Sequence, residues 1–299
     1  MIYTVTFNPA VDLVVDIAEI KQGEVNRLSG EQVFFGGKGI NVSVILHELG
    51  VPTKVLGFIA GFTGAAIEQS LRDCGITTDF IRLPDGFSRI NVKIRSGGET
   101  ELNGSGPDID EASLDRLFGL IGWLSEGDTL VLAGSVPKSL PSDIYERILQ
   151  RIAGKGVRAA VDASGELLMN VLKYEPFVVK PNIHELGGMF GKTIRNADEA
   201  VPYAVKLKEM GAKNVLVSMG GDGALLIDEY GKEHRCGVCR GTVKNSVGAG
   251  DSMLAGFIAG CEKGDYGYAL KLGTAAGGAT AFSDGLACKE RIDEMMSRL

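Results

Sequence analysis

A glycine-rich turn near the carboxyl end of the chain, Gly248-Ala249-Gly250-Asp251, runs directly into an apolar, helix-like segment of small residues. Because these residues carry little or no side chain, the backbone N–H groups of Ala249, Gly250 and Asp251 can point together at an anion. The helix amino terminus adds its partial positive charge. Asp251 falls in the first turn, where a carboxylate beside an anion hole can accept a hydroxyl proton. The turn therefore predicts phosphoryl transfer with Asp251 as the base; the alternative is that Asp251 only caps the helix.

A second glycine motif, Phe35-Gly36-Gly37-Lys38-Gly39-Ile40-Asn41, opens the first long predicted helix. Gly36 and Gly37 allow the backbone to approach a ligand, while Lys38 offers a point charge. A flexible turn would explain the glycines but not the lysine among them. The spacing is not that of a G-x-x-x-x-G-K-[ST] phosphate loop, which disfavours a P-loop NTPase. A dinucleotide fingerprint would follow the first strand, and here that strand ends in Phe7-Asn8-Pro9-Ala10.

The elements that must position these motifs alternate between short apolar runs and helical patterns. Predicted strands are Ile2–Phe7, Lys54–Ile59, Thr129–Ala133, Arg158–Asp162, Phe177–Val179 and Val215–Ser218, and predicted helices include Ile40–Leu49, Gly64–Asp73, Ser142–Ala153 and Asp198–Met210. This alternation predicts an α/β protein whose mostly parallel sheet is covered on both faces.

Two stretches interrupt that alternation, at about residues 11–35 and 87–103, where hydrophobic residues alternate with charged or polar ones. We interpret them as a small β-sheet lid that projects from the main sheet; the alternative is a pair of edge hairpins. No long linker or internal repeat divides the chain, so residues 1–299 are predicted to form a single domain.

Composition narrows the classes of partner. The net charge is −7, which disfavours nucleic acid as a partner, and no apolar stretch is long enough to predict a membrane span. The number of cysteines is odd, with no secretion signal, which predicts reduced thiols and a cytoplasmic location. Cys236-Gly237-Val238-Cys239 has metal-ligand spacing but lacks a second pair nearby, so we set a zinc site aside.

The two glycine motifs, about two hundred residues apart and in this order, resemble the two signatures of the ribokinase-like (PfkB-type) carbohydrate kinases. The resemblance covers essentially the whole chain. It implies a three-layer α/β/α sandwich with a β-sheet lid, and a kinase that uses ATP and Mg²⁺. The segments Thr6–Asp12, Gly23–Arg27 and Ser88–Lys93 resemble the branch that phosphorylates hexose phosphates. Within it we expect fructose 1-phosphate as the acceptor; tagatose 6-phosphate and fructose 6-phosphate are the alternatives.

The resemblance also implies roles on the sugar side. Asp12 would hold sugar hydroxyls, helped by Gly37 and Asn41, and Lys38, Arg27 and Arg89 would meet the phosphate already present on the substrate. The predicted sugar site thus comprises Asp12, Arg27, Gly36, Gly37, Lys38, Asn41, Arg89 and Asn103. A dianion favours several cations, and arginine offers a planar fork for phosphate oxygens. Without the family pattern, Arg27 and Arg89 would read equally well as solvated surface charges.

On the nucleotide side, Asn182 and Glu185 match the family's Asn-x-x-Glu motif, which organises Mg²⁺ largely through water. An acidic residue at a helix start is the plain alternative for Glu185. The glycines after Ser218 resemble the loop beneath ATP, although Gly-Asp-Gly also suits a hairpin turn. The predicted nucleotide site is Lys180, Asn182, Ser218, Gly220, Gly221, Gly223, Ser246, Gly248 and Gly250.

Other readings remain open on the sequence alone. A nucleoside kinase or a kinase of unphosphorylated sugars would not need three cations in the sugar site. A sugar-phosphate sensor would have little use for both a base and an anion hole. We also expect that the lid could pair with a second copy of the chain to form a homodimer.

Overall fold

A computed structural model describes all 299 residues. The main sheet contains nine strands in the order β13-β12-β11-β10-β9-β8-β1-β4-β5. The strands from β11 to β5 in this order run parallel, and β12 is antiparallel to both of its neighbours, β11 and β13. The bounds are β1 Ile2–Thr6, β4 Thr53–Ile59, β5 Thr77–Arg82, β8 Thr129–Ala133, β9 Arg158–Asp162, β10 Val178–Val179, β11 Asn214–Ser218, β12 Ala224–Ile227 and β13 Glu233–Cys236.

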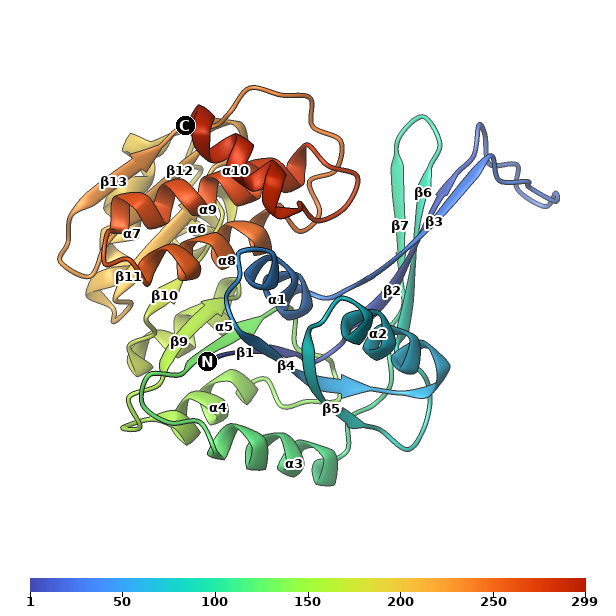
Figure 1. Cartoon of the computed structure of the whole chain (residues 1–299), viewed down its shortest axis with the longest axis horizontal. Helices are drawn as coiled ribbons and strands as arrows, with labels where there is room; N and C mark the ends of the chain where they lie inside the picture. The colour runs from blue at the N-terminus through green and yellow to red at the C-terminus, as the bar shows by residue number, and fades with distance from the viewer.

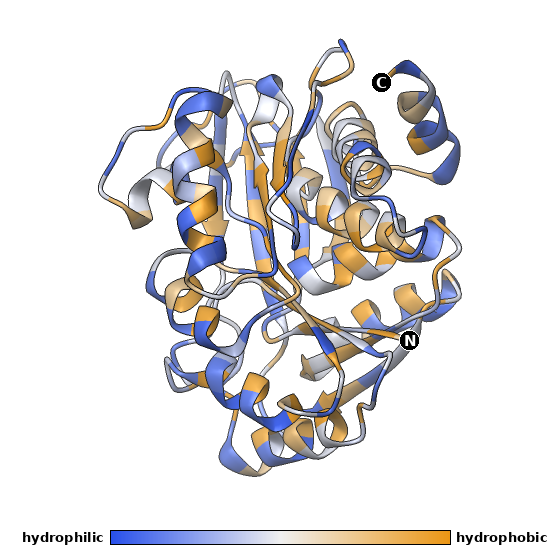
Figure 2. Cartoon of the chain, turned by 90° about the vertical axis from the view of Figure 1, so that its left-hand side faces the viewer, coloured by the Kyte–Doolittle hydropathy of each residue, from blue (hydrophilic) through white to orange (hydrophobic).

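Helices cover both faces of this sheet, which gives three layers (Figure 1). One face carries α3 (Glu111–Gly122), α4 (Ile144–Ile152), α5 (Gly165–Val171), α6 (Ile183–Met189) and α7 (Ala197–Glu209). The other carries α1 (Lys38–Glu48), α2 (Gly61–Asp73), α8 (Ala249–Cys261), α9 (Tyr266–Ala281) and α10 (Lys289–Arg298). The central strands are apolar on both faces, as expected of a parallel sheet between two helical layers, and their hydrophobic colouring stands out in Figure 2.

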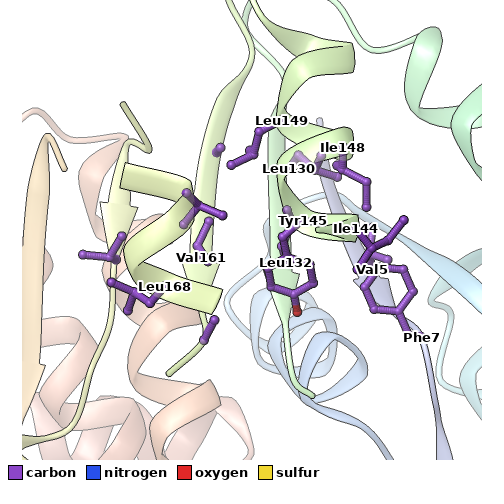
Figure 3. Close-up of a cluster of buried hydrophobic side chains, with 14 of the residues drawn as sticks. Val5, Phe7, Leu130, Leu132, Ile144, Tyr145, Ile148, Leu149, Val161 and Leu168 are labelled. Atoms are coloured by element: carbon purple, nitrogen blue, oxygen red, sulfur yellow. The ribbon is translucent and has the colours of Figure 1, made fainter. Parts of the chain in front are cut away.

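The packing of α4 shows how sequence period produces this layer. Its apolar residues recur at Ile144, Tyr145, Ile148, Leu149 and Ile152, all of them buried, so one stripe of the helix faces the sheet. That stripe packs on side chains of β1, β8 and β9 (Figure 3). The hydroxyl of Tyr145 donates to the carbonyl oxygen of Gly134, 2.9 Å away, so this core contact also fixes the backbone just after β8.

A second sheet of four strands, in the order β3-β2-β6-β7, projects from the body (Figure 1). Its strands are β2 (Ala10–Asp16), β3 (Gly30–Gly36), β6 (Arg89–Arg95) and β7 (Glu99–Asn103). The predicted small accessory sheet is therefore present as a separate sheet. The alternative of two edge hairpins on the main sheet is wrong, because β2 and β6 pair with each other in parallel. We call this four-stranded sheet the lid.

The predicted strands and helices of the main body are all present; β8 and β9 have the predicted ends, and the others are shifted at one or both ends. The α/β fold class is confirmed. The sequence analysis did not identify β5, β12, β13, α3, α5 or α10. The small-residue run Gly273–Ala279 of α9 packs closely against α8, since a Cβ at Gly273 would lie 2.7 Å from the carbonyl oxygen of Met253. No helix is long and apolar enough to cross a membrane.

Candidate active site

Two polar cavities of about 510 and 280 Å³ lie side by side at the carboxyl ends of the parallel strands. They share lining residues, namely Gly37, Lys38, Arg89, Asp162 and Glu185. This edge is where open α/β sheets bind ligands. A larger cavity, of about 720 Å³, lies at the opposite, amino-terminal edge of the sheet near Arg158 and Lys213. We assign the site to the smaller pair because both predicted signatures open into it.

Asp251 is buried at the start of α8, and its carboxylate has one hydrogen-bond partner within the protein. The side-chain amide of Asn41 in α1 donates to its Oδ2 at 2.8 Å. The N-cap of α8 is Gly248, and the one side-chain hydrogen bond of Asp251 goes to Asn41 rather than to the backbone of its own helix. Asp251 therefore does not cap α8 through a hydrogen bond. Burial, together with the negative charge of Asp162, raises the pKa of Asp251 to about 6. A carboxylate with a pKa near neutrality is suited to act as a general base.

The amino terminus of α8 offers two free backbone donors next to that carboxylate. Neither the N–H of Gly250 nor that of Asp251 donates a hydrogen bond inside the protein, whereas the N–H of Ala249 donates to the carbonyl oxygen of Ser246 at 3.2 Å. Of the three amides predicted to form an anion hole, two are thus free to bind an anion and the third is not. Gly248 provides the entry turn, with a left-handed φ of 80° that favours glycine.

Asp162, at the carboxyl end of β9, is the most deeply buried charge in the cavities. Its Oδ2 lies 3.3 Å from the Lys38 ammonium, and its Oδ1 lies 3.4 Å from the Lys180 ammonium. Burial acts to raise the pKa of Asp162, but the two lysines outweigh it and hold that pKa below its ordinary value. For Lys38, burial acts to lower the pKa, but Asp162 and Asp251 outweigh it and raise the pKa. Asp162 and Lys38 therefore both stay charged at neutral pH.

The lid supplies the opposite wall. Asn91 in β6 donates to Asp12 Oδ1 in β2 at 2.7 Å, and Asn91 Oδ1 in turn accepts from the N–H of Gly104 at 3.1 Å. Arg89 points its Nε at the carbonyl oxygen of Asn8, 3.1 Å away, and burial lowers its pKa. Lys93, two residues further along β6, also lines the larger cavity of the pair; its side chain is only 11% exposed, and its ammonium lies 3.7 Å from Glu101.

The nucleotide-side motif forms the start of α6. Asn182 accepts hydrogen bonds from the backbone of His184 and Glu185, and Glu185 Oε2 accepts from the backbone of Asn182, which together make a capping box. Glu185 therefore does have the structural role that the sequence left open, as an acidic residue at a helix start. Glu185 still lines both cavities, and its Oε1 has no hydrogen-bond partner in the chain, so one carboxylate oxygen remains for a ligand.

Most predicted site residues converge on these cavities, and some do not. The 510 Å³ cavity is lined by Asp12, Gly37, Lys38, Asn41, Arg89, Asn103, Lys180, Asn182, Glu185, Ser218, Gly248, Gly250 and Asp251. Gly36 is adjacent, since a Cβ there would lie 3.4 Å from Asn41 Oδ1. Arg27 is exposed in the segment between β2 and β3 and lines neither cavity.

The remaining nucleotide-side predictions also lie outside the lining. Gly220 and Gly221 form a short turn between β11 and β12, and Gly223 is required by packing, since a Cβ there would lie 2.1 Å from the carbonyl oxygen of Cys236. The hairpin alternative thus describes this loop. Ser246 contributes its carbonyl oxygen to Ala249, and its predicted contact with a nucleotide stays a prediction.

Sequence reasoning missed several lining residues. Asp162 was placed only as the last residue of a strand, and Asn91, Lys93 and Glu101 only within lid strands; Gly134 and Ser135 line the smaller cavity as well. Position offers a usable signal for Asp162, because an acidic residue that ends a buried parallel strand must lie at the ligand-binding edge.

Comparison with known proteins decides the family. A family model described as pfkB family carbohydrate kinase matches residues 5–290 of the chain. The chain belongs to this family. Two sequence relatives of this PfkB kinase cover nearly its whole length. It is 46% identical over 297 residues to a 1-phosphofructokinase of Bacillus subtilis (99% of this chain, 97% of that protein). It is 38% identical over 301 residues to a D-tagatose-1-phosphate kinase of Bacillus licheniformis (100% and 98%).

Solved structures agree with the fold of the PfkB kinase. Phosphofructokinase-2 from Escherichia coli, in complex with substrates and products, superimposes with a TM-score of 0.92 at 26% identity and covers 100% of this chain and 99% of that chain. A ribokinase of Arabidopsis thaliana superimposes with a TM-score of 0.82 at 19% identity, over 99% of this chain and 98% of that chain. The fold is ribokinase-like.

Proposed function

We propose that this PfkB kinase transfers the γ-phosphoryl group of ATP to a free hydroxyl of a ketohexose 1-phosphate, with fructose 1-phosphate as the preferred acceptor. One observation carries the proposal. The buried carboxylate of Asp251 stands beside two unused backbone amides, in a polar cavity into which Lys38, Arg89, Lys93 and Lys180 also open. A base, an anion hole and several cations are what transfer between two anionic substrates requires.

In this proposal the chain's own groups divide the work. The ionised Asp251 accepts the proton of the attacking hydroxyl, and Asn41 holds Oδ2 so that the carboxylate cannot rotate away. The free amides of Gly250 and Asp251 face the negative charge that moves with the phosphoryl group. Asp12, fixed by Asn91, accepts hydrogen bonds from sugar hydroxyls. Arg89, with Lys38, faces the phosphate already on the sugar.

Mg²⁺ is expected with ATP, and the donor set fits an ion held mainly through water. No group of three or more His, Cys, Asp or Glu side chains is arranged to hold a metal ion. Asn182 Oδ1 is already used by two backbone amides, which leaves Glu185 Oε1 as the free protein oxygen of the motif. Mg²⁺ keeps several waters and takes few protein ligands. When bound, it would shield the charge of the nucleotide phosphates.

The choice of a 1-phosphate rests on the relatives. The sequence relatives described above are named as kinases of fructose 1-phosphate and of D-tagatose 1-phosphate, and these two sugars differ only in the configuration at one ring carbon. A tagatose 1-phosphate is thus a stronger second candidate than the tagatose 6-phosphate expected from the sequence. Fructose 6-phosphate remains a third, since phosphofructokinase-2 from Escherichia coli has been solved with fructose-6-phosphate.

The test is a coupled ADP-release assay with Mg-ATP and the four sugars fructose 1-phosphate, tagatose 1-phosphate, fructose 6-phosphate and tagatose 6-phosphate. We expect a kcat/KM for fructose 1-phosphate at least about tenfold above the others, which corresponds to ~1.4 kcal/mol of transition-state binding. A preference for tagatose 1-phosphate or a 6-phosphate would keep the mechanism and change the acceptor. No turnover of any of the four would overturn the proposal in favour of a sensor.

As part of the same proposal, the lid closes over the sugar and also pairs with the lid of a second copy. Strand register aligns Val33, Leu13, Val92 and Leu102 in one row across all four strands, and Val33 and Leu102 are 54% and 56% exposed. This row lies on the face opposite Asp12 and Asn91. A continuous apolar row that is half-exposed favours association.

Sedimentation of the variant Val33→Asp/Leu102→Asp tests the pairing. We expect a monomer, whereas Gln32→Asp, on the other face of β3, should sediment as wild type. Unchanged sedimentation of the double variant would contradict pairing through the lid.

Because ATP and sugar phosphates are cytoplasmic metabolites, the proposed activity also implies a cytoplasmic location for the protein.

A further inference from the structure

Asp162 is a buried carboxylate without an assigned task. It ends β9, its side chain is 3% exposed, and it lies between the two lysines that come nearest to the base. Burying a carboxylate with two ammonium groups costs several kcal/mol of desolvation, and such clusters are weak contributors to stability. Stability alone therefore does not explain why a carboxylate is buried at this position. Its place between two lysines that line the site indicates a role in function.

The two lysines reach Asp162 from different elements. Lys38 is the first residue of α1, and Lys180 follows β10. Lys180 passes directly beneath the first turn of α8, because a Cβ on Gly250 would lie only 3.2 Å from its ammonium nitrogen. Both positive charges act on Asp251, yet neither lysine forms an ion pair with it; both ion pairs go to Asp162.

A base that forms a salt bridge with lysine would be a poor base. The ammonium group would favour the carboxylate form so strongly that it would no longer take up a proton during the reaction. The bound lysine would also occupy the space that the acceptor hydroxyl must enter. Something must hold Lys38 and Lys180 near the site, where phosphates need them, and away from Asp251.

We propose that Asp162 is a positioning residue for phosphoryl transfer: its two carboxylate oxygens hold Lys38 and Lys180 off Asp251 until the phosphate groups of the substrates engage them. The inference rests on the proposed function. It does not require Asp162 to touch either substrate. Its physical basis is competition between two carboxylates for the same two ammonium groups, with Asp162 able to accept one lysine on each oxygen while Asn41 occupies Oδ2 of Asp251.

The charged and polar groups that face Asp251 are Asn41 and Lys38 from α1, Asp162 from β9 and Lys180 from the segment after β10; Glu185 from α6 acts on Lys38. Of these, Asp162 raises the pKa of Asp251, whereas Asn41, Lys38 and Lys180 lower it. Removing the charge of Asp162 removes the raising influence and releases the two lowering ones. Both changes move the pKa of Asp251 in the same direction, downward.

The experiment is the pH profile of kcat for Asp162→Asn, with Asp162→Glu as the conservative variant. We expect the acidic limb of Asp162→Asn to move about one unit or more to lower pH, with a plateau kcat at least about tenfold lower, because a weaker base transfers protons less well. Asp162→Glu should keep the limb near the wild-type position. Since a sugar phosphate itself titrates near pH 6, each limb is read as a difference between variants.

A second variant separates positioning from a structural or metal-binding role. In Asp162→Asn/Lys180→Met one competing lysine is gone, so the acidic limb should move back toward the wild-type pH. An unmoved limb in Asp162→Asn would overturn the proposal, and so would a defect that added Mg²⁺ cures without any movement of the limb.

The same pKa can be measured without turnover, which separates this inference from the proposed function. The unfolding midpoints of the proteins with and without Asp251→Asn are compared across pH, first with Asp162 intact and then in the Asp162→Asn background. The pH at which the two midpoints diverge reports the pKa of Asp251. We expect the divergence to begin at lower pH in the Asp162→Asn background, and an identical divergence in both backgrounds would overturn the proposal even if the enzyme had another substrate.

Discussion

The side-chain amide of Asn41 donates a hydrogen bond of 2.8 Å to Oδ2 of Asp251, although the two residues are 210 positions apart in the chain. This bond joins the two glycine motifs: one supplies the base and the other supplies the group that orients it. The sequence analysis assigned Asn41 to the sugar. In the structure its amide nitrogen donates to the carboxylate, while its carbonyl oxygen has no hydrogen-bond partner in the chain. We therefore expect its main effect on the reaction to pass through Asp251, and its contact with the sugar stays a prediction.

That bond gives the first prediction, for Asn41→Ala. Losing a donor to the charged form raises the pKa of Asp251 further above its value of about 6. A smaller fraction of the base is then ionised near pH 6.5, and kcat should fall several-fold there and recover in large part at pH 8.5. The movement is opposite to that expected for Asp162→Asn. Equal loss of kcat at every pH would mean that Asn41 acts by contact with the sugar instead.

Asp251→Asn should separate activity from stability. The pKa of Asp251 is raised in the folded protein from 3.8 to about 6, so its contribution to stability is present at low pH and lost as the pH rises through about 6. Above that pH the buried charge costs about 3 kcal/mol relative to the protonated form.

The variant should therefore lose several orders of magnitude in kcat and yet unfold at a higher temperature than wild type at pH 8, with no such gain at pH 4. Thermal unfolding at the two pH values, with ATP binding measured by calorimetry as a control for the fold, checks both halves. A variant less stable than wild type at pH 8 would contradict the raised pKa.

The residues that sequence reasoning placed correctly belong to local patterns. The strand β8 is an uninterrupted apolar run, and both ends of Thr129–Ala133 are as predicted. The Gly248–Asp251 turn is likewise defined by neighbours in sequence. The prediction that all three amides of this turn are free was not met, because the N–H of Ala249 donates to the carbonyl oxygen of Ser246 and only two donors remain free.

What the sequence could not supply are partnerships between distant elements. Nothing near Asp162 in sequence indicates that lysines from α1 and from the end of β10 will meet it, and nothing near Lys93 indicates that the lid will bury it. Gly37 and Gly39 illustrate a different limit. They look like ligand-binding glycines, but a Cβ at Gly37 would lie 2.5 Å from Thr6 Cγ2, and one at Gly39 would lie 2.6 Å from the carbonyl oxygen of Val5. The close packing of the start of α1 on β1 is therefore enough to require glycine at both positions, without any ligand.

Gly250→Ala tests whether the start of α8 must stay bare. The added Cβ would lie 3.2 Å from the Lys180 ammonium and beside a free amide, so we expect kcat to fall about tenfold or more with the fold retained. Gly119→Ala is the matched control in the middle of α3, where a Cβ meets nothing within 4 Å. It should leave kcat unchanged and add about 0.5–1 kcal/mol of stability through helix propensity. Wild-type kcat in Gly250→Ala would remove the lysine and the amide from the transfer step.

Lys93 and Arg95 provide a test within a single strand. Both lie in β6, and each has its charged group 3.7 Å from a glutamate of β7, Glu101 for Lys93 and Glu99 for Arg95. They differ in surroundings, since Lys93 is 11% exposed and lines the 510 Å³ cavity, whereas Arg95 is 36% exposed and lies outside it. In both pairs the glutamate is exposed, Glu101 at 41% and Glu99 at 45%. An ion pair at this distance that is open to water on one side contributes about 1 kcal/mol or less, so we expect the fold to survive the loss of either pair.

We therefore expect Lys93→Ala to raise KM for the sugar phosphate about tenfold or more, with KM for ATP and the unfolding temperature little changed, because a cation that faces a dianion in a polar cavity contributes to its binding. Arg95→Ala removes an equivalent ion pair and should change none of the three quantities. Initial-rate kinetics with each substrate varied in turn decide the matter. If both variants raise KM equally, the effect comes from charge on the lid as a whole; if only KM for ATP rises, Lys93 faces the nucleotide rather than the sugar.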